Sequence, residues 1–249
     1  MVPRVNGRRV AIPELFLGLL AIGIAFVLVA HIVSSTVRDV RHTRDTLSVT
    51  ASARVPISAN LVTWTLTVSV EDATTAPAAR RLRRDVSAVR AFLLSARIPA
   101  DAITPSVVSS SEIVIRLPHR RRRIRYRVYQ NLQVRTKEID VVAAAATRVG
   151  ELLERGIAVE AQPVAYLSTE LADAKLTALE RATAEARRRA EILARGLGGK
   201  LGRMRSSSQG VYQVTPRDST DVSDYGINDT SSREKDVNAV VSATFAVNR

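Results

Sequence analysis

The stretch that decides the fold runs from Val62 to Val70 and reads VTWTLTVSV. Apolar side chains occupy every second position, which is the period of a β-strand with one buried face. Threonine fills most of the opposite face, and β-branched residues favour extended backbone. This segment therefore predicts a strand that points Trp64 into a hydrophobic core.

Further strands and helices flank this segment on both sides. Strand patterns lie at residues 47–55 (interrupted by Pro56), 106–117, 124–137, 162–167, 201–214 and 237–247. Helical spacing lies at residues 75–98, 140–156 and 172–197, with a capping hydroxyl expected at Thr75 and a cap at Asp140. Residues 215–236 read as a long loop. Strands mixed with helices in this order predict an α+β fold of antiparallel strands, with helices packed on the sheet.

Two of these segments have a regular apolar pattern. In the strand at 124–137 the face expected to point inward comprises Ile124, Tyr126, Val128, Leu132 and Val134. In the helix at 172–197 the residues that hold helical spacing for about seven turns are Ala172, Leu176, Leu179, Ala182, Ala186, Ala190, Leu193 and Leu197.

The N-terminus carries an apolar run of 19 residues, from Leu15 to Val33, preceded by three arginines. A run of about 20 apolar residues spans a hydrocarbon core of about 30 Å, and basic residues before it favour a cytoplasmic N-terminus. The sequence predicts a signal anchor in residues 1–34, a juxtamembrane linker in 35–46 and an extracytoplasmic domain in 47–249. The alternative is a cleaved signal peptide ending near Ala30. Either way, the main domain is expected in the periplasm, and the anchor reading makes the protein a single-pass protein of the inner membrane.

The composition limits the chemistry. The chain has no cysteine, which excludes a disulfide framework, a thiolate metal site and a cysteine nucleophile. Its formal net charge is +13, so its partners are expected to be acidic. With a membrane signal present, anionic lipid or an acidic envelope polymer is the favoured partner, and nucleic acid is disfavoured.

An arginine-rich segment, residues 116–135, spans the connection between two expected strands and is the strongest candidate site. It contains no acidic residue, and its arginines are Arg116, Arg120, Arg121, Arg122, Arg123, Arg125, Arg127 and Arg135. Arginine stays charged and binds phosphate or carboxylate through two parallel hydrogen bonds. We therefore take an anion-binding site at Arg120, Arg121, Arg122, Arg123, Arg125 and Arg127 as a hypothesis. The alternative is a hairpin tip that charge keeps soluble.

Other patterns fail to define a site. The three histidines, His31, His42 and His119, lie in the apolar run, in the linker and before four arginines, so none has a suitable acid beside it. The glycines of residues 196–202 lack the spacing of a phosphate-binding loop and fit the end of a helix. The aspartates of residues 218–229 lack the order of a calcium loop and are interpreted as solvated. The prediction is no catalytic residue, no cofactor and no metal site.

Three stretches together resemble the SIMPL-domain family of bacterial envelope proteins. The first is the turn with Pro56 and Ala59 before the long alternating strand, and the second is YRVYQNLQV at residues 126–134. The third is the alanine-rich helix of residues 182–202, closed by Leu197-Gly198 and Lys200-Leu201-Gly202. The resemblance covers about residues 45–248.

The resemblance implies an exported α+β domain that often self-associates into rings and is linked to stress tolerance. It implies no catalytic residues. The retained anchor and the arginine run depart from the family's usual pattern. The leading hypothesis is a non-enzymatic, membrane-anchored envelope protein acting as a homo-oligomer by self-assembly and contact, in envelope or oxidative stress tolerance. The alternative is an anion-binding module whose hairpin binds lipid phosphates or acidic polymers.

Overall fold

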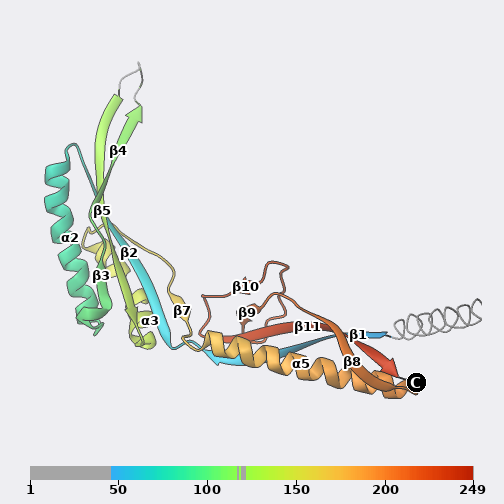
Figure 1. Cartoon of the computed structure of the whole chain (residues 1–249). Helices are drawn as coiled ribbons and strands as arrows, with labels where there is room; N and C mark the ends of the chain where they lie inside the picture. Colours follow the sequence, from blue (N-terminus) through green and yellow to red (C-terminus); the bar gives the residue numbers. More distant parts are fainter. Residues whose placement is uncertain (1–45, 117, 119–121, 249) are drawn as a thin grey trace, which may run out of the picture. The chain divides into compact units, whose positions relative to one another are not determined.

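The computed structural model describes residues 46–116, 118 and 122–248, and it shows an α+β protein built on two sheets (Figure 1). The fold class predicted from the sequence is confirmed. The predicted anchor in residues 1–34 lies outside the described residues, as does the predicted linker apart from Thr46. No described helix is long and apolar enough to cross a membrane.

The first sheet is organised around the decisive strand β2. Its central strands follow the order β3-β5-β2-β6. Strand β4 also pairs with β5, and β7 also pairs with β2. Trp64 lies opposite Val134 in the antiparallel β2–β5 pair. The strands are β2 (Leu61–Asp72), β3 (Ile103–Pro105), β4 (Ser109–Arg116), β5 (Arg122–Thr136), β6 (Val159–Ala161) and β7 (Ala165–Leu167).

Helix α2 (Thr75–Ser95) covers the apolar face of this sheet. It buries Leu82, Val89 and Leu93 against that face, as its spacing predicts. The predicted cap at Thr75 is wrong, because the helix starts there and Thr74 precedes it without a side-chain capping bond. The other helices of this part are the single turn η1 (Ala100–Ala102), α3 (Ile139–Thr147) and α4 (Gly150–Glu154). The predicted helix 140–156 is thus two helices, and Glu138 rather than Asp140 is its N-cap.

The second sheet has the order β1-β11-β9-β10, with β8 also paired to β11. Pro56 lies inside β1, not at its end, because β1 is an edge strand and the missing N–H breaks no central ladder. The short β9–β10 pair is parallel and departs from the predicted antiparallel pattern. The strands are β1 (Thr46–Ser58), β8 (Lys200–Gln209), β9 (Gln213–Pro216), β10 (Ile227–Asn228) and β11 (Glu234–Asn248).

Helix α5 (Leu171–Gly196) packs on this second sheet through alanine. Its buried residues step by four: Ala174, Ala178, Ala182, Ala186, Ala190 and Ala194. Three leucines of the same helical pattern, Leu176, Leu193 and Leu197, keep 60%, 46% and 78% of their surface exposed. The helix therefore approaches the strands through its smallest side chains.

The chain divides into two compact units. The larger holds residues 50–186 and 208–242, and both clusters of buried side chains lie within it. The described part of the smaller holds residues 46–49, 187–207 and 243–248. In the smaller unit a Cβ on Gly199 would lie 2.8 Å from Cγ1 of Val247, so a larger residue just before β8 would force its neighbours on β11 to shift.

Candidate anion-binding surface

The hairpin of β4 and β5 extends beyond the other strands of its sheet. Strand β2 ends at Asp72, opposite Tyr126, whereas the β4–β5 ladder continues as far as Arg116 opposite Arg122. Four residue pairs therefore form a two-stranded ribbon beyond the end of β2, and Figure 1 shows it reaching past α2. The sequence places most of the arginine run on this ribbon.

The ribbon concentrates cations that have no acidic partner in the part of the chain that the structure describes. Arg116 and Arg122 lie directly opposite each other, and like charges in that position destabilise a strand pair. These two side chains and Arg123 form no ion pair with any described residue. Of the predicted anion-binding residues, Arg120 and Arg121 lie outside the described residues.

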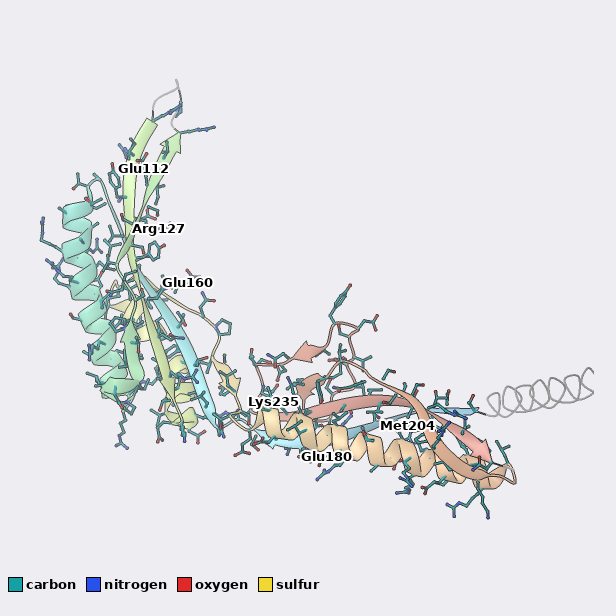
Figure 2. The ribbon with its side chains drawn as sticks, viewed as in Figure 1. Glu112, Arg127, Glu160, Glu180, Met204 and Lys235 are labelled. Carbon is teal, nitrogen blue, oxygen red and sulfur yellow. The ribbon has the colours of Figure 1, made fainter. Side chains whose placement is uncertain are left out.

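The two remaining predicted residues already have partners at the base of the ribbon. Arg127 donates from Nε (2.9 Å) and from its terminal nitrogen (2.6 Å) to the Glu71 carboxylate, so its charge is compensated. Arg125 donates to the backbone oxygen of Glu71 at 3.3 Å, which leaves its charge uncompensated. Figure 2 labels Arg127. The structure thus brings Arg122, Arg123 and Arg125 together as available cations and separates Arg127 from them.

Aliphatic side chains accompany the arginines. Val114 lies opposite Ile124, and each keeps 46% of its surface exposed. Because side chains alternate between faces, this pair shares a face with Arg116 and Arg122. The prediction that Ile124 points into the core is wrong, since β5 at this point has left the cover of α2. The ribbon therefore presents cations and exposed hydrophobic side chains together.

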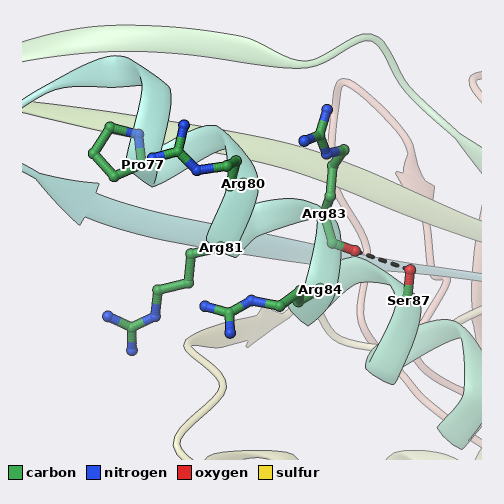
Figure 3. A pocket seen from close by; sticks show the side chains of 6 residues that line it. All are labelled: Pro77, Arg80, Arg81, Arg83, Arg84 and Ser87. Carbon is green, nitrogen blue, oxygen red and sulfur yellow. Dashed lines mark hydrogen bonds between the residues drawn. The ribbon is translucent and has the colours of Figure 1, made fainter.

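A second group of arginines lies on the outer surface of α2. Arg80, Arg81, Arg83 and Arg84 line a shallow, open basin in its first turns (Figure 3). Arg81 approaches Asp85 at 4.0 Å, while the other three form no ion pair with any described residue. Since α2 begins three residues after β2 ends, these turns lie at the same end of the sheet as the ribbon.

Nothing among the described residues adds a metal site, because no three His, Cys, Asp or Glu side chains cluster there. The three histidines all lie outside the described residues. The absence of catalytic, cofactor and metal residues therefore stays a prediction.

Sequence reasoning missed one buried ion pair. Lys235 Nζ donates to Asp229 Oδ2 at 2.9 Å and to the Asp229 backbone oxygen at 2.7 Å. The side chains are only 3% and 9% exposed, so the prediction that Asp229 is solvated is wrong. Burial alone would raise the pKa of Asp229, but hydrogen bonds from Ser231 and Lys235 outweigh it and hold that pKa well below its ordinary value. The available signal was Asp229-Thr-Ser231, since an aspartate often accepts from the N–H two residues later.

The architecture and this surface define an α+β protein with a projecting cationic ribbon. The sequence profile of the SIMPL family, described as a protein of unknown function (DUF541), matches residues 47–245. The chain therefore belongs to the SIMPL family. A comparison with curated proteins finds no match.

Proposed function

We propose that the protein is a non-enzymatic contact protein of the bacterial envelope whose β4–β5 ribbon binds an anionic surface. The observation that carries this proposal is the pair Arg116 and Arg122, opposed across the strands with no ion pair to a carboxylate of the described residues. A phosphate or carboxylate between them would replace repulsion by charge-assisted hydrogen bonds. In this proposal the apolar run of residues 15–33 holds the chain on the membrane.

Lipid is the anion source that the ribbon favours. A soluble polymer needs only the cations, whereas Val114, Ile115 and Ile124 also expose aliphatic surface beside them. Each basic residue near an anionic membrane adds roughly 1 kcal/mol of attraction within a Debye length of about 8 Å. Arg116, Arg122 and Arg123 form no ion pair with a described residue, so together they supply about 3 kcal/mol. Shallow insertion of the aliphatic side chains adds to this attraction.

The test is binding to phosphatidylglycerol vesicles by residues 46–249, which contain both buried clusters and leave out the apolar run. Replacing Arg116, Arg122 and Arg123 by Ser should weaken binding by roughly a hundredfold. The melting temperature should stay almost unchanged, because these side chains are exposed. Moderate salt should weaken the wild-type protein in the same way.

A matched control removes three positive charges elsewhere. Arg181, Arg203 and Arg205 are exposed on α5 and β8, and their replacement by Ser should leave most of the binding. Val114→Ser with Ile124→Ser separates the two anion sources, because it should weaken vesicle binding and spare binding to soluble polyphosphate. Vesicle binding that is unchanged in the triple ribbon variant would refute the proposal.

Self-association is a second function, and exposed aliphatic residues on α5 favour it. Ile192, Leu193 and Leu197 keep 51%, 46% and 78% of their surface exposed near the end of this helix. Clusters of this kind mark contact surfaces. We expect light scattering to give a multiple of the monomer mass, and Leu193→Glu with Leu197→Glu to give the monomer. Ala184→Glu, an exposed control on the same helix, should keep the oligomer. A wild-type monomer at every concentration would exclude this function.

A further inference from the structure

A cavity of about 240 Å³ lies between the first turn of α5 and the start of β11. Aliphatic side chains make up much of its wall: Ile57, Leu61, Leu167, Leu171 and Val214. The remaining lining residues are polar or charged: Arg135, Tyr166, Ser168, Thr169, Asn228, Asp229 and Lys235. Apolar walls combined with polar groups are the usual form of a small-molecule site.

The polar groups of this cavity favour a negative charge. Lys235 and Asp229 compensate each other, so this pair adds no net charge. Arg135 also lines the cavity and forms no ion pair with any described residue. The cavity therefore carries one uncompensated cation.

The start of α5 adds hydrogen-bond donors to the same cavity. The first backbone bond of the helix runs from Ala174 N–H to Glu170 O, so the N–H groups of Leu171, Ala172 and Asp173 precede the first intrahelical acceptor. Leu171, Ser168 and Thr169 line the cavity at this end. N–H groups at a helix start attract anions, and Arg135 strengthens that attraction.

The walls of the cavity are already held in place. Asn60 and Thr169 exchange two hydrogen bonds of 2.8 Å, which fix the turn that leads into α5. Tyr166 N–H donates to Thr230 O at 2.7 Å, and the Arg233 guanidinium stacks 5.4 Å from the centre of the Tyr166 ring. A site organised before binding spends less free energy on ordering.

We propose that this cavity binds a short aliphatic carboxylate, with its carboxylate at Arg135 and the start of α5 and its chain against Leu61 and Val214. A free phosphate lacks the apolar part that these walls would cover. The volume is below the roughly 300–1,000 Å³ of pockets for drug-sized ligands, which favours a chain of only a few carbons.

The test is calorimetric titration of the full chain with hexanoate, with hexanol as the neutral control and amide NMR shifts as the locator. Hexanoate should shift the amides of residues 171–173, and hexanol should bind at least about tenfold more weakly, since it lacks a charge-assisted bond to Arg135.

Two matched variants decide the role of Arg135. Arg135→Gln should weaken hexanoate binding about tenfold, while Arg90→Gln, which changes an exposed arginine of α2, should leave it unchanged. Three results would each overturn the proposal: no hexanoate binding, equal binding of hexanol, or equal binding by Arg135→Gln. Vesicle binding through the ribbon is measured separately, so either proposal can fail alone.

Discussion

Helices α2 and α5 each cover a sheet, yet they do so with different side chains. Beneath α2 the buried cluster contains Trp64, Leu66, Leu82 and Leu93, all at most 1% exposed. The face that α5 buries consists of six alanines. The first interface gains its stability from the area of large apolar side chains, and the second from close approach of the helix backbone to the strands.

The spacing of the alanines explains why α5 uses them. Six positions four residues apart advance by about 40° per step around a helix of 3.6 residues per turn. The contact line therefore winds by about 200° along α5, which suits a helix lying on twisted strands. Only small side chains keep the helix close along such a line.

The largest loss of stability should follow from removing a large side chain from the buried cluster beneath α2. Trp64→Ala removes a side chain that is 1% exposed and deletes the 3.0 Å bond from its Nε1 to Gln162 O. We expect a loss of roughly 3–5 kcal/mol in the free energy of unfolding, measured by chemical denaturation. An unchanged midpoint would show that the large side chains of this core do not carry its stability.

The Lys235–Asp229 ion pair is buried, whereas the Arg127–Glu71 pair of the first sheet is exposed. The buried pair should therefore contribute more to the free energy of unfolding. Asp229→Asn leaves the buried Lys235 without its carboxylate, and breaking one side of a buried pair costs roughly 3–5 kcal/mol. We expect a loss of about 3 kcal/mol, because the single amide oxygen can keep the bond from Ser231, whereas the NH2 group in place of Oδ2 cannot accept those from Ser232 and Lys235. Denaturation at pH 7 measures it.

The loss of stability in Asp229→Asn should depend on pH. The pKa of Asp229 is lowered in the folded chain, so the unfolded chain binds more protons in acid. The stabilisation is complete above the ordinary carboxyl pKa of about 3.9 and is lost as the pH falls through the lower folded pKa. The difference between wild type and Asp229→Asn should therefore be smaller at pH 3 than at pH 7. An equal difference at both pH values would show that the charge is not its cause.

The sequence predicted most of the secondary structure because alternation and helical spacing report local geometry directly. β2, β5, α2 and α5 all lie where these patterns placed them. The pattern could not choose the inward face of α5, since leucine and alanine both fit helical spacing and Leu176 is the more hydrophobic residue. In the structure Ala174, Ala178 and Ala182 join the second buried cluster, and helical spacing alone does not specify this choice.

The sequence also predicted only part of the candidate site, because local patterns do not report contacts between distant residues. The run of like charge was visible in the sequence, and it located Arg122 and Arg123 on a hairpin. The partner of Arg127 was not visible, because Glu71 lies 56 residues away and reaches it only through the β2–β5 register. Lys235 and Asp229 looked like ordinary surface residues, and only tertiary packing buries them.

Overpacking the alanine interface should have an intermediate effect. Ala182 is 0% exposed, so Ala182→Leu forces α5 away from its sheet and should cost about 1–3 kcal/mol. Ala184→Leu, the same change on the exposed face two residues along, should change stability by less than about 0.5 kcal/mol. Thermal unfolding of both variants measures the difference. Equal stability of the two would mean that close approach is not what this interface requires.

The smallest change in stability should come from the exposed ion pair of the first region. Glu71 and Arg127 keep 37% and 51% of their side-chain surface exposed, and such pairs contribute about 0.2–1 kcal/mol. Glu71→Gln should therefore lower the free energy of unfolding by less than about 1 kcal/mol, measured by chemical denaturation. A loss as large as that of Asp229→Asn would remove the contrast between exposed and buried pairs.

The same substitution also frees Arg127 at the base of the cationic ribbon. One more available cation adds roughly 1 kcal/mol of attraction to an anionic membrane, so vesicle binding should tighten about fivefold. Glu160→Gln is the matched control, because it removes an equal charge from β6 (Figure 2). If Glu160→Gln tightens binding as much, net charge rather than the released Arg127 governs attraction, and the ribbon loses its special role.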